Sequence, residues 1–126
     1  MGKRVLVVDD HPPTVELIRD ALVREGFAVL SAANGAECLR KVSAHRPDLV
    51  ILDIVMPVMD GLKTLRALRG KPETENLPVI VLTVRTRAAD VLAGWAAGAD
   101  IYLTKPCKIQ HLVATVKRVL GVHVHI

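Results

Sequence analysis

The stretch Val5-Leu-Val-Val-Asp-Asp10 decides the fold, because four consecutive aliphatic residues lead directly into two carboxylates. An unbroken run of leucine and β-branched residues predicts a strand buried on both faces, as in a parallel sheet covered by helices. Two further short apolar runs stop just before Asp53 and Thr83, and Lys105 follows a fourth run, Ile101-Tyr-Leu103, after one intervening residue. Because the carboxyl ends of parallel strands meet at one edge of a sheet, where ligands bind, we expect these polar residues to lie together.

The chemistry of this edge follows from the residue types. Asp9, Asp10 and Asp53 would bring three negative charges together, and like charges repel unless a cation lies among them. Carboxylate oxygens are ligands for hard divalent metals. A lysine, Lys105, and a hydroxyl, Thr83, at the same edge suit a tetrahedral anion. The sequence therefore predicts a metal-assisted phosphoryl-acceptor site.

Strand and helix patterns alternate five times along the chain. Strands are expected at residues 5–8, 28–31, 48–53, 79–82 and 101–103. Pro12-Pro13 opens the first helix and Asn34-Gly35 precedes the second, while Thr86 is expected to cap the fourth. Alternation of this kind implies parallel pairing through right-handed crossovers. We expect one α/β domain.

The composition excludes several classes of protein. The chain has 126 residues, of which 51% are hydrophobic, but no apolar run approaches the roughly 18 residues of a membrane span. We expect a cytoplasmic protein with no membrane contact. Cys38 and Cys107 lack metal-ligand spacing and are expected to be reduced and in or near the core. The net charge is +4, but the basic residues are dispersed, so no direct nucleic-acid binding is expected.

Four motifs in order resemble the response-regulator receiver domain of two-component signalling. They are Val7-Val-Asp-Asp10, Leu52-Asp-Ile-Val-Met-Pro-Val-Met-Asp-Gly61, Val81-Leu-Thr83 and Ala97-Gly-Ala-Asp-Ile-Tyr-Leu-Thr-Lys-Pro106. The resemblance covers residues 3–120 and leaves 121–126 as a tail or the start of a linker. It implies a doubly wound (βα)5, flavodoxin-like three-layer sandwich with a parallel sheet in the order 2-1-3-4-5.

The resemblance also implies roles for the residues at the sheet edge. Asp53 would accept a phosphoryl group from the phosphohistidine of a sensor histidine kinase or phosphotransfer protein, with Lys105 supplying positive charge. Asp10 would bind magnesium directly and Asp9 largely through water, joined by Asp53 and the backbone carbonyl of Val55, and Mn²⁺ is an alternative metal. Such a protein catalyses only its own phosphorylation and dephosphorylation, so we do not expect an enzyme acting on other substrates.

Thr83 and Tyr102 resemble the switch pair of the family. The threonine would move to the phosphoryl group and the aromatic ring would turn inward, changing the face made by the fourth helix, fifth strand and fifth helix. Homodimerisation through that face is a family habit. A downstream protein or a fused output domain would read the signal. Pro106 resembles the family proline that follows a cis peptide bond and aims Lys105 into the site.

Val55 and Arg85 occupy the two positions that flank the path of the hydrolytic water in the family. Val55 offers that water no side-chain hydrogen bond, which predicts slow autodephosphorylation. Arg85 either folds over the phosphoryl group or lies exposed in its loop. Trp95 falls on a helical stripe with Val91 and is expected to be at least partly buried, either as core or on a partner-binding face.

Competing functions are less consistent with these residues. A dehalogenase-type phosphatase would place a second aspartate two residues after the nucleophile, where this chain has Val55. A flavin carrier would need a hydroxyl-rich phosphate loop in place of the acidic one after the first strand. A phosphorylation-independent pseudo-receiver, acting as an interaction module, stays open as the alternative.

Overall fold

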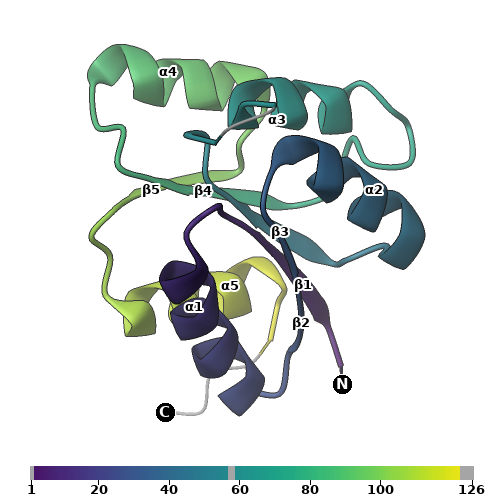
Figure 1. Ribbon diagram of the computed structural model, residues 1–126, viewed down its shortest axis with the longest axis vertical. Helices are drawn as coiled ribbons and strands as arrows, with labels where there is room; N and C mark the ends of the chain where they lie inside the picture. The colour runs from purple at the N-terminus through teal and green to yellow at the C-terminus, as the bar shows by residue number, and fades with distance from the viewer. Residues whose placement is uncertain (1, 57–58, 123–126) are drawn as a thin grey trace.

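Within residues 2–56 and 59–122, which the computed structural model describes, five strands alternate with five helices (Figure 1). The elements are β1 (Arg4–Val8), α1 (Pro12–Arg24), β2 (Ala28–Ala32), α2 (Gly35–His45), β3 (Leu49–Leu52), α3 (Gly61–Arg69), β4 (Val79–Thr83), α4 (Ala88–Ala97), β5 (Ile101–Thr104) and α5 (Ile109–Val119). Pro57, Val58 and the histidines of the tail lie outside the described residues.

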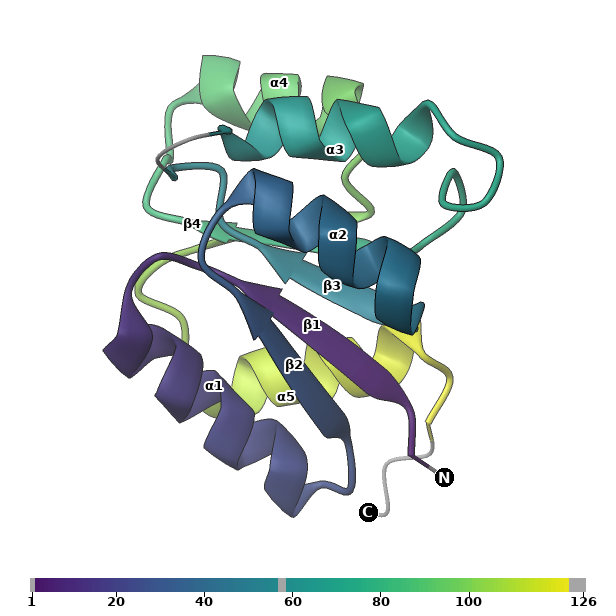
Figure 2. The same ribbon diagram turned by 45° about the vertical axis from the view of Figure 1, so that its right-hand side comes forward.

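The strands form one parallel sheet in the order β2-β1-β3-β4-β5, which confirms the predicted topology. Helices α1 and α5 cover one face, and α2, α3 and α4 cover the other (Figure 2). In the register of the sheet Val8 lies opposite Leu52. The residue that follows each of these two strands is an aspartate, so the register of the sheet places Asp9 beside Asp53.

The core consists of two aliphatic layers, one on each side of the sheet. Successive side chains of a strand point to opposite faces. Leu6 and Val8 therefore pack under α2 and α3, while Val5 and Val7 pack against α1 and α5. All four are at most 1% exposed. Burying a side chain of this size contributes about 1.5–3 kcal/mol, so these layers hold the sheet edge in place.

Local signals set most helix starts. Pro12 and Pro13 lie in the first turn of α1, where a missing N–H costs nothing. The side chain of Asn34 caps α2 by accepting a hydrogen bond from the backbone N–H of Glu37. The expected cap by Thr86 is wrong. Helix α4 begins at Ala88 after an extended Arg87, which is the N-cap and makes no side-chain cap.

Helix α4 excludes the core position, one of the two alternatives expected for Trp95. Its buried residues are Gly94 and Ala97, whereas Trp95 is 46% exposed and Val91 is only partly buried. The inner face of α4 is made of small residues because the ring of Tyr102 lies against Gly94. The large side chains of this helix therefore point outward, and Trp95 is not a core residue.

Both cysteines are free thiols. Cys38 lies on the buried face of α2, and burial raises the pKa of its thiol to about 12. Cys107 is partly exposed after β5. Among the residues that the structure describes, no helix combines the length and apolarity needed to cross a membrane.

Candidate functional site

The backbone ladder of the sheet continues one residue beyond β1 and β3 and so fixes the acid pair. The backbone N–H of Asp9 donates to the carbonyl of Ala32, and that of Asp53 donates to the carbonyl of Val8, both at 3.0 Å. The two aspartates are only 5% and 6% exposed. Two nearly buried carboxylates side by side require a positive partner.

Lys105 is that partner. Its Nζ lies 2.7 Å from Oδ2 of Asp9 and 3.1 Å from Oδ2 of Asp53. Burial opposes the charge on the lysine, but the hydrogen bonds to Asp9 and Asp53 and their negative charges outweigh it, so the pKa of Lys105 is raised. The Lys105–Pro106 peptide bond is cis.

The second oxygen of each carboxylate is also held. Oδ1 of Asp9 accepts a hydrogen bond from the backbone N–H of His11, and Oδ1 of Asp53 accepts one from the backbone N–H of Val55, both at 2.9 Å. Among the described residues, no buried side-chain nitrogen or oxygen lacks a hydrogen-bond partner. The acid pair is therefore rigidly oriented by two backbone amides and one ammonium group.

Asp10 follows at the same edge but is exposed to solvent. Within the described part of the chain, no three Asp, Glu, His or Cys side chains form a group that could hold a metal ion. Asp9 and Asp53 each give one oxygen to Lys105 here. The chemistry of the donors still fits magnesium, because all are hard oxygen ligands at an open edge and the pair already shares a cation.

Thr83 ends β4 beside this site and is fully buried. The backbone N–H of Arg85 lies 3.4 Å from its hydroxyl oxygen. The carbonyl of Arg85 accepts a 2.8 Å hydrogen bond from the hydroxyl of Tyr102. Burial raises the pKa of Tyr102, and the negative charge of Asp90 adds to the effect. Thr83 and Tyr102 are thus linked through one residue.

The side chain of Arg85 is 47% exposed and pairs with Asp90 in the first turn of α4, at 3.8 Å. Two residues of this region, Asp90 and Gly94, are not among those predicted from the sequence. No sequence signal marks Asp90. Gly94 is an isolated glycine inside a helical pattern, which is a signal of a packing or functional requirement.

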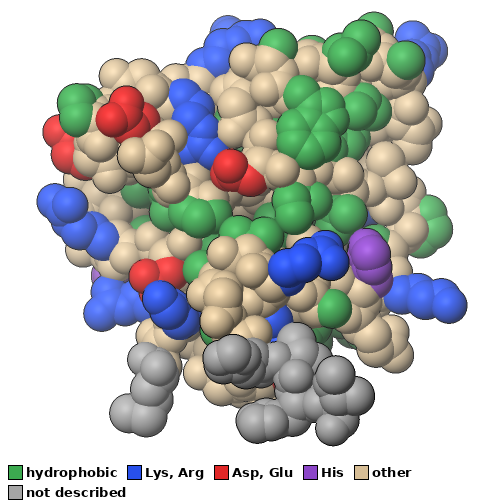
Figure 3. All heavy atoms as spheres, turned by 180° about the vertical axis from the view of Figure 1, so that it is seen from behind, with side chains coloured by type: hydrophobic (Ala, Val, Ile, Leu, Met, Phe, Trp, Pro, Cys, Tyr) green, Lys and Arg blue, Asp and Glu red, His purple; other side chains and the backbone are tan. Residues whose placement is uncertain are grey.

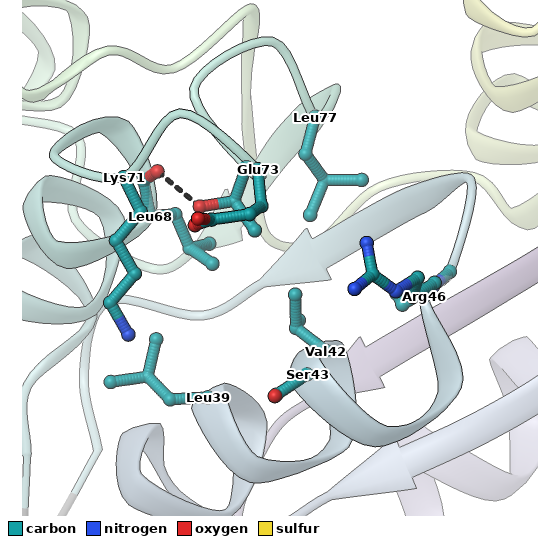
Figure 4. Close-up of a pocket in the computed structure, with 10 residues that line it drawn as sticks. Leu39, Val42, Ser43, Arg46, Leu68, Lys71, Glu73 and Leu77 are labelled. Carbon is teal, nitrogen blue, oxygen red and sulfur yellow. Dashed lines mark hydrogen bonds between the residues drawn. The ribbon is translucent and has the colours of Figure 1, made fainter.

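A separate pocket of about 410 Å³ lies between α2 and the loop that follows α3, with Leu68 of α3 also in its lining (Figure 4). Its lining includes Pro47 and Leu77, which come just before β3 and β4. It therefore opens at the amino ends of these strands, on the opposite edge of the sheet from Asp53. Its floor is aliphatic and its rim carries Arg46, Lys71 and Glu73.

The fold and the site together define a class: doubly wound α/β proteins with a buried acid pair and a lysine at the carboxyl edge of the sheet. Comparison with known proteins gives the family. The family model of the response regulator receiver domain matches residues 5–117. The chain therefore belongs to the response regulator receiver domain family, and it is a signalling protein of two-component systems rather than a conventional enzyme.

Curated relatives agree with this assignment. The chain is 45% identical over 117 residues to the transcriptional regulatory protein PrrA of Mycobacterium tuberculosis, covering 93% of the chain and 49% of PrrA. It is 41% identical over 120 residues to the response regulator MprA of the same organism, covering 95% of the chain and 51% of MprA. The chain thus spans about half the length of these relatives.

Solved structures agree as well. A putative response regulator from Chloroflexus aurantiacus superposes with a TM-score of 0.91 at 35% identity, covering 96% of this chain and 99% of that one. Chemotaxis protein CheY4 of Vibrio cholerae gives 0.88 at 34% identity, covering 94% and 99%. The receiver domain of the Pseudomonas aeruginosa sensor histidine kinase PA1611, described with magnesium in its active-site cleft, gives 0.88 at 30% identity, covering 96% and 99%.

Proposed function

We propose that the chain is a phosphorylation-dependent switch in which Asp53 accepts a phosphoryl group from a sensor histidine kinase or phosphotransfer protein. The observation that supports this most is the buried pair Asp9 and Asp53 sharing the ammonium of Lys105. A carboxylate oxygen of Asp53 would attack phosphorus, the phosphorus–nitrogen bond of the phosphohistidine would break, and the imidazole would leave with the electron pair. Lys105 then offers its charge to the phosphoryl oxygens.

Asp9, Asp10, Asp53 and the backbone carbonyl of Val55 would hold Mg²⁺, or Mn²⁺ in its place. When bound, the metal would offset the negative charge that develops as the phosphoryl group transfers. The chain's own residues do the positioning. The backbone amides of His11 and Val55 hold the two buried carboxylates in fixed orientation, which leaves little reorganisation for the reaction.

The signal would leave the site through Thr83 and Tyr102. In this proposal the Thr83 hydroxyl moves to the phosphoryl group, and Tyr102 changes its orientation in response. The path is short, because Arg85 contacts both residues through its backbone. The output is a change in the α4-β5-α5 face, a two-state response to a local change of charge.

Autodephosphorylation would be slow. Val55 presents only aliphatic atoms to the edge, and 39% of it is exposed. Arg85 pairs with Asp90 at the start of α4. Neither side chain is thus arranged as a base or an orienting group for a hydrolytic water.

The output partner would be a downstream protein or a fused output domain, and nucleic-acid binding would belong to that domain. The relatives that are twice as long as this chain, and the name of PrrA as a transcriptional regulator, support a fused domain. The cytoplasm is the expected location. Hydrophobic side chains gather over α4 (Figure 3), and they would serve a homodimer through α4-β5-α5. The exposed apolar residues of this region include Val84, Leu92 and Trp95.

The test is intact-mass spectrometry after incubation with acetyl phosphate, with and without magnesium. Wild type is expected to gain one phosphoryl group only when magnesium is present, and Asp53→Asn is expected to gain none. Asp20→Asn removes an exposed carboxylate of α1 and is the matched control, expected to behave as wild type.

The alternative is a pseudo-receiver that acts as an interaction module without phosphorylation. It makes the opposite prediction in the same experiment. Absence of an adduct on wild type, together with no change in Trp95 fluorescence on adding beryllofluoride and magnesium, would replace the switch by this module.

A further inference from the structure

The ring of Tyr102 lies directly on the backbone of α4 at Gly94. A Cβ atom added at Gly94 would stand 2.6 Å from Cε2 and 2.7 Å from Cδ2 of the tyrosine ring. These distances are far shorter than a van der Waals contact between carbon atoms, which is about 3.5–4.0 Å. The observed orientation of Tyr102 therefore requires a residue without a side chain at position 94.

The hydroxyl end of the same ring is anchored elsewhere. It donates to the carbonyl of Arg85 at 2.8 Å, in the loop between β4 and α4. The side chain of Arg85 in turn pairs with Asp90 of α4. Tyr102 thus bridges the middle of α4 and the loop that carries the backbone contact to Thr83.

Gly94 is an unfavourable choice for the helix itself. Glycine in a helix interior destabilises it relative to alanine, because the unfolded chain loses more freedom. Positions 93, 96 and 97 of the same helix are all alanine. No positive φ is recorded for Gly94, so the backbone does not require glycine there. The close approach of the Tyr102 ring is what requires glycine at this position.

We infer that Gly94 is a positioning residue for Tyr102, and that the size of residue 94 sets the share of molecules in which the ring reaches the Arg85 carbonyl. The inference rests on the proposed switch, since it gives Gly94 control over how a change at Thr83 reaches the α4-β5-α5 face. Any side chain at position 94 forces the ring to move, because the ring is the mobile partner and the helix backbone is not.

The chain contains a single tyrosine, so labelling with 3-fluorotyrosine gives one ¹⁹F resonance that reports on Tyr102 alone. Spectra of the full chain are recorded with magnesium, before and after adding beryllofluoride. In Gly94→Ala we expect a resonance shifted from wild type before any addition, and a beryllofluoride-induced change at most half that of wild type. The rate of phosphoryl adduct formation from acetyl phosphate should stay within about twofold of wild type, since Gly94 is not among the residues proposed to bind the metal or the phosphoryl group.

Gly70→Ala is the matched control, because a Cβ at Gly70 meets only backbone oxygens at ordinary distances of 3.4 Å and 3.7 Å. It should leave the ¹⁹F resonance unchanged. Identical spectra for Gly94→Ala and wild type in both states would overturn the inference, as would an equal shift in Gly70→Ala. If beryllofluoride does not change the wild-type resonance but Gly94→Ala does shift it, the proposed relay is contradicted, whereas the role of Gly94 in positioning Tyr102 is supported.

A thermal-unfolding cycle tests the contact independently of the label. In a Tyr102→Ala background, Gly94→Ala should raise the midpoint of unfolding, since the helix gains alanine and loses no contact. In the protein that retains Tyr102, Gly94→Ala should raise the midpoint of unfolding less, or lower it. Equal effects in the two backgrounds would contradict the contact.

Discussion

Lys105 is the residue on which the acid edge depends most. Asp9 and Asp53 are almost fully removed from water, and their charges are balanced by one ammonium group. A buried ion pair is a weak source of net stability, but removal of one partner leaves an uncompensated buried charge. Function and stability are therefore coupled at this lysine.

Replacing Lys105 with methionine should lower the free energy of unfolding by about 2–4 kcal/mol at pH 7, because two carboxylates then face each other without a cation. The same variant should gain more thermal stability from magnesium than wild type does. Urea unfolding and melting curves with and without magnesium measure both effects. Lys63→Met, at an exposed position of α3, should change neither.

The pH dependence has a definite sign. Because the pKa of Lys105 is raised in the folded state, its contribution is fully present below the unfolded pKa of about 10.4 and is lost as pH rises through the folded value. The difference between wild type and Lys105→Met should thus be constant from pH 7 to 9 and shrink above roughly pH 10.4. A difference that grows in that range would refute the assignment.

Arg85→Ala tests the proposal on autodephosphorylation. Because the side chain pairs with Asp90, its removal should leave the half-life of the acyl phosphate within about threefold of wild type, a barrier change below roughly 0.7 kcal/mol. The decay of the phosphoryl adduct, followed by mass spectrometry with magnesium, measures this lifetime. A strongly lengthened lifetime would mean that Arg85 assists the hydrolytic water.

At the scale of elements, Arg69 at the end of α3 ties together segments that the sequence separates. Its guanidinium donates to the carbonyls of Thr74 and Leu77 in the following loop and to that of Gly98 at the end of α4, and it pairs with Asp100 at 2.9 Å. These bonds connect the end of α3 to the residue that caps α4 and to the residue just before β5.

Arg69→Met should lower the free energy of unfolding by roughly 2–4 kcal/mol, since it leaves several partly buried carbonyl groups without a donor. Chemical denaturation measures the loss. Arg66→Met, at an exposed site one turn earlier in α3, should cost no more than about 0.5 kcal/mol. Equal losses in the two variants would show that the bonds of Arg69 are dispensable.

At the scale of the whole molecule, the exposed apolar side chains of α4 are arranged for a partner rather than for the core. Leu92 is 68% exposed and Trp95 46%. If the α4-β5-α5 face forms a homodimer on phosphorylation, Leu92→Glu should raise the dissociation constant of the beryllofluoride-bound dimer at least tenfold, because it buries a charge in an apolar contact. Light scattering at several concentrations measures this constant.

Leu17→Glu is the control for this experiment. Leu17 is 60% exposed and lies on α1, on the other side of the sheet from α4. It should leave the dimer unchanged. Equal weakening by both changes would point to a different interface.

Features that depend on local sequence patterns could be predicted from the chain, whereas features that depend on contacts between distant elements could not. The apolar runs that end at Asp9 and Asp10 and at Asp53 were enough to predict buried parallel strands and their common edge, whereas the order of the strands came from the resemblance to the receiver family. Helical spacing was a less reliable guide to burial where a neighbouring element covers the inner face of the helix. Trp95 has the spacing of a buried stripe, but Tyr102 occupies the inner face of α4, and the indole points outward.

The sequence by itself determined the sheet, its carboxyl edge and the set of polar residues there, because alternation of strands and helices and the ends of apolar runs are local patterns. Only the tertiary structure decided which atoms of these residues meet. Lys105 bridges Asp9 and Asp53 across 96 and 52 residues of chain, and Tyr102 reaches both Gly94 and Arg85. Such contacts depend on packing between elements at ångström distances, which no pattern along a single chain encodes.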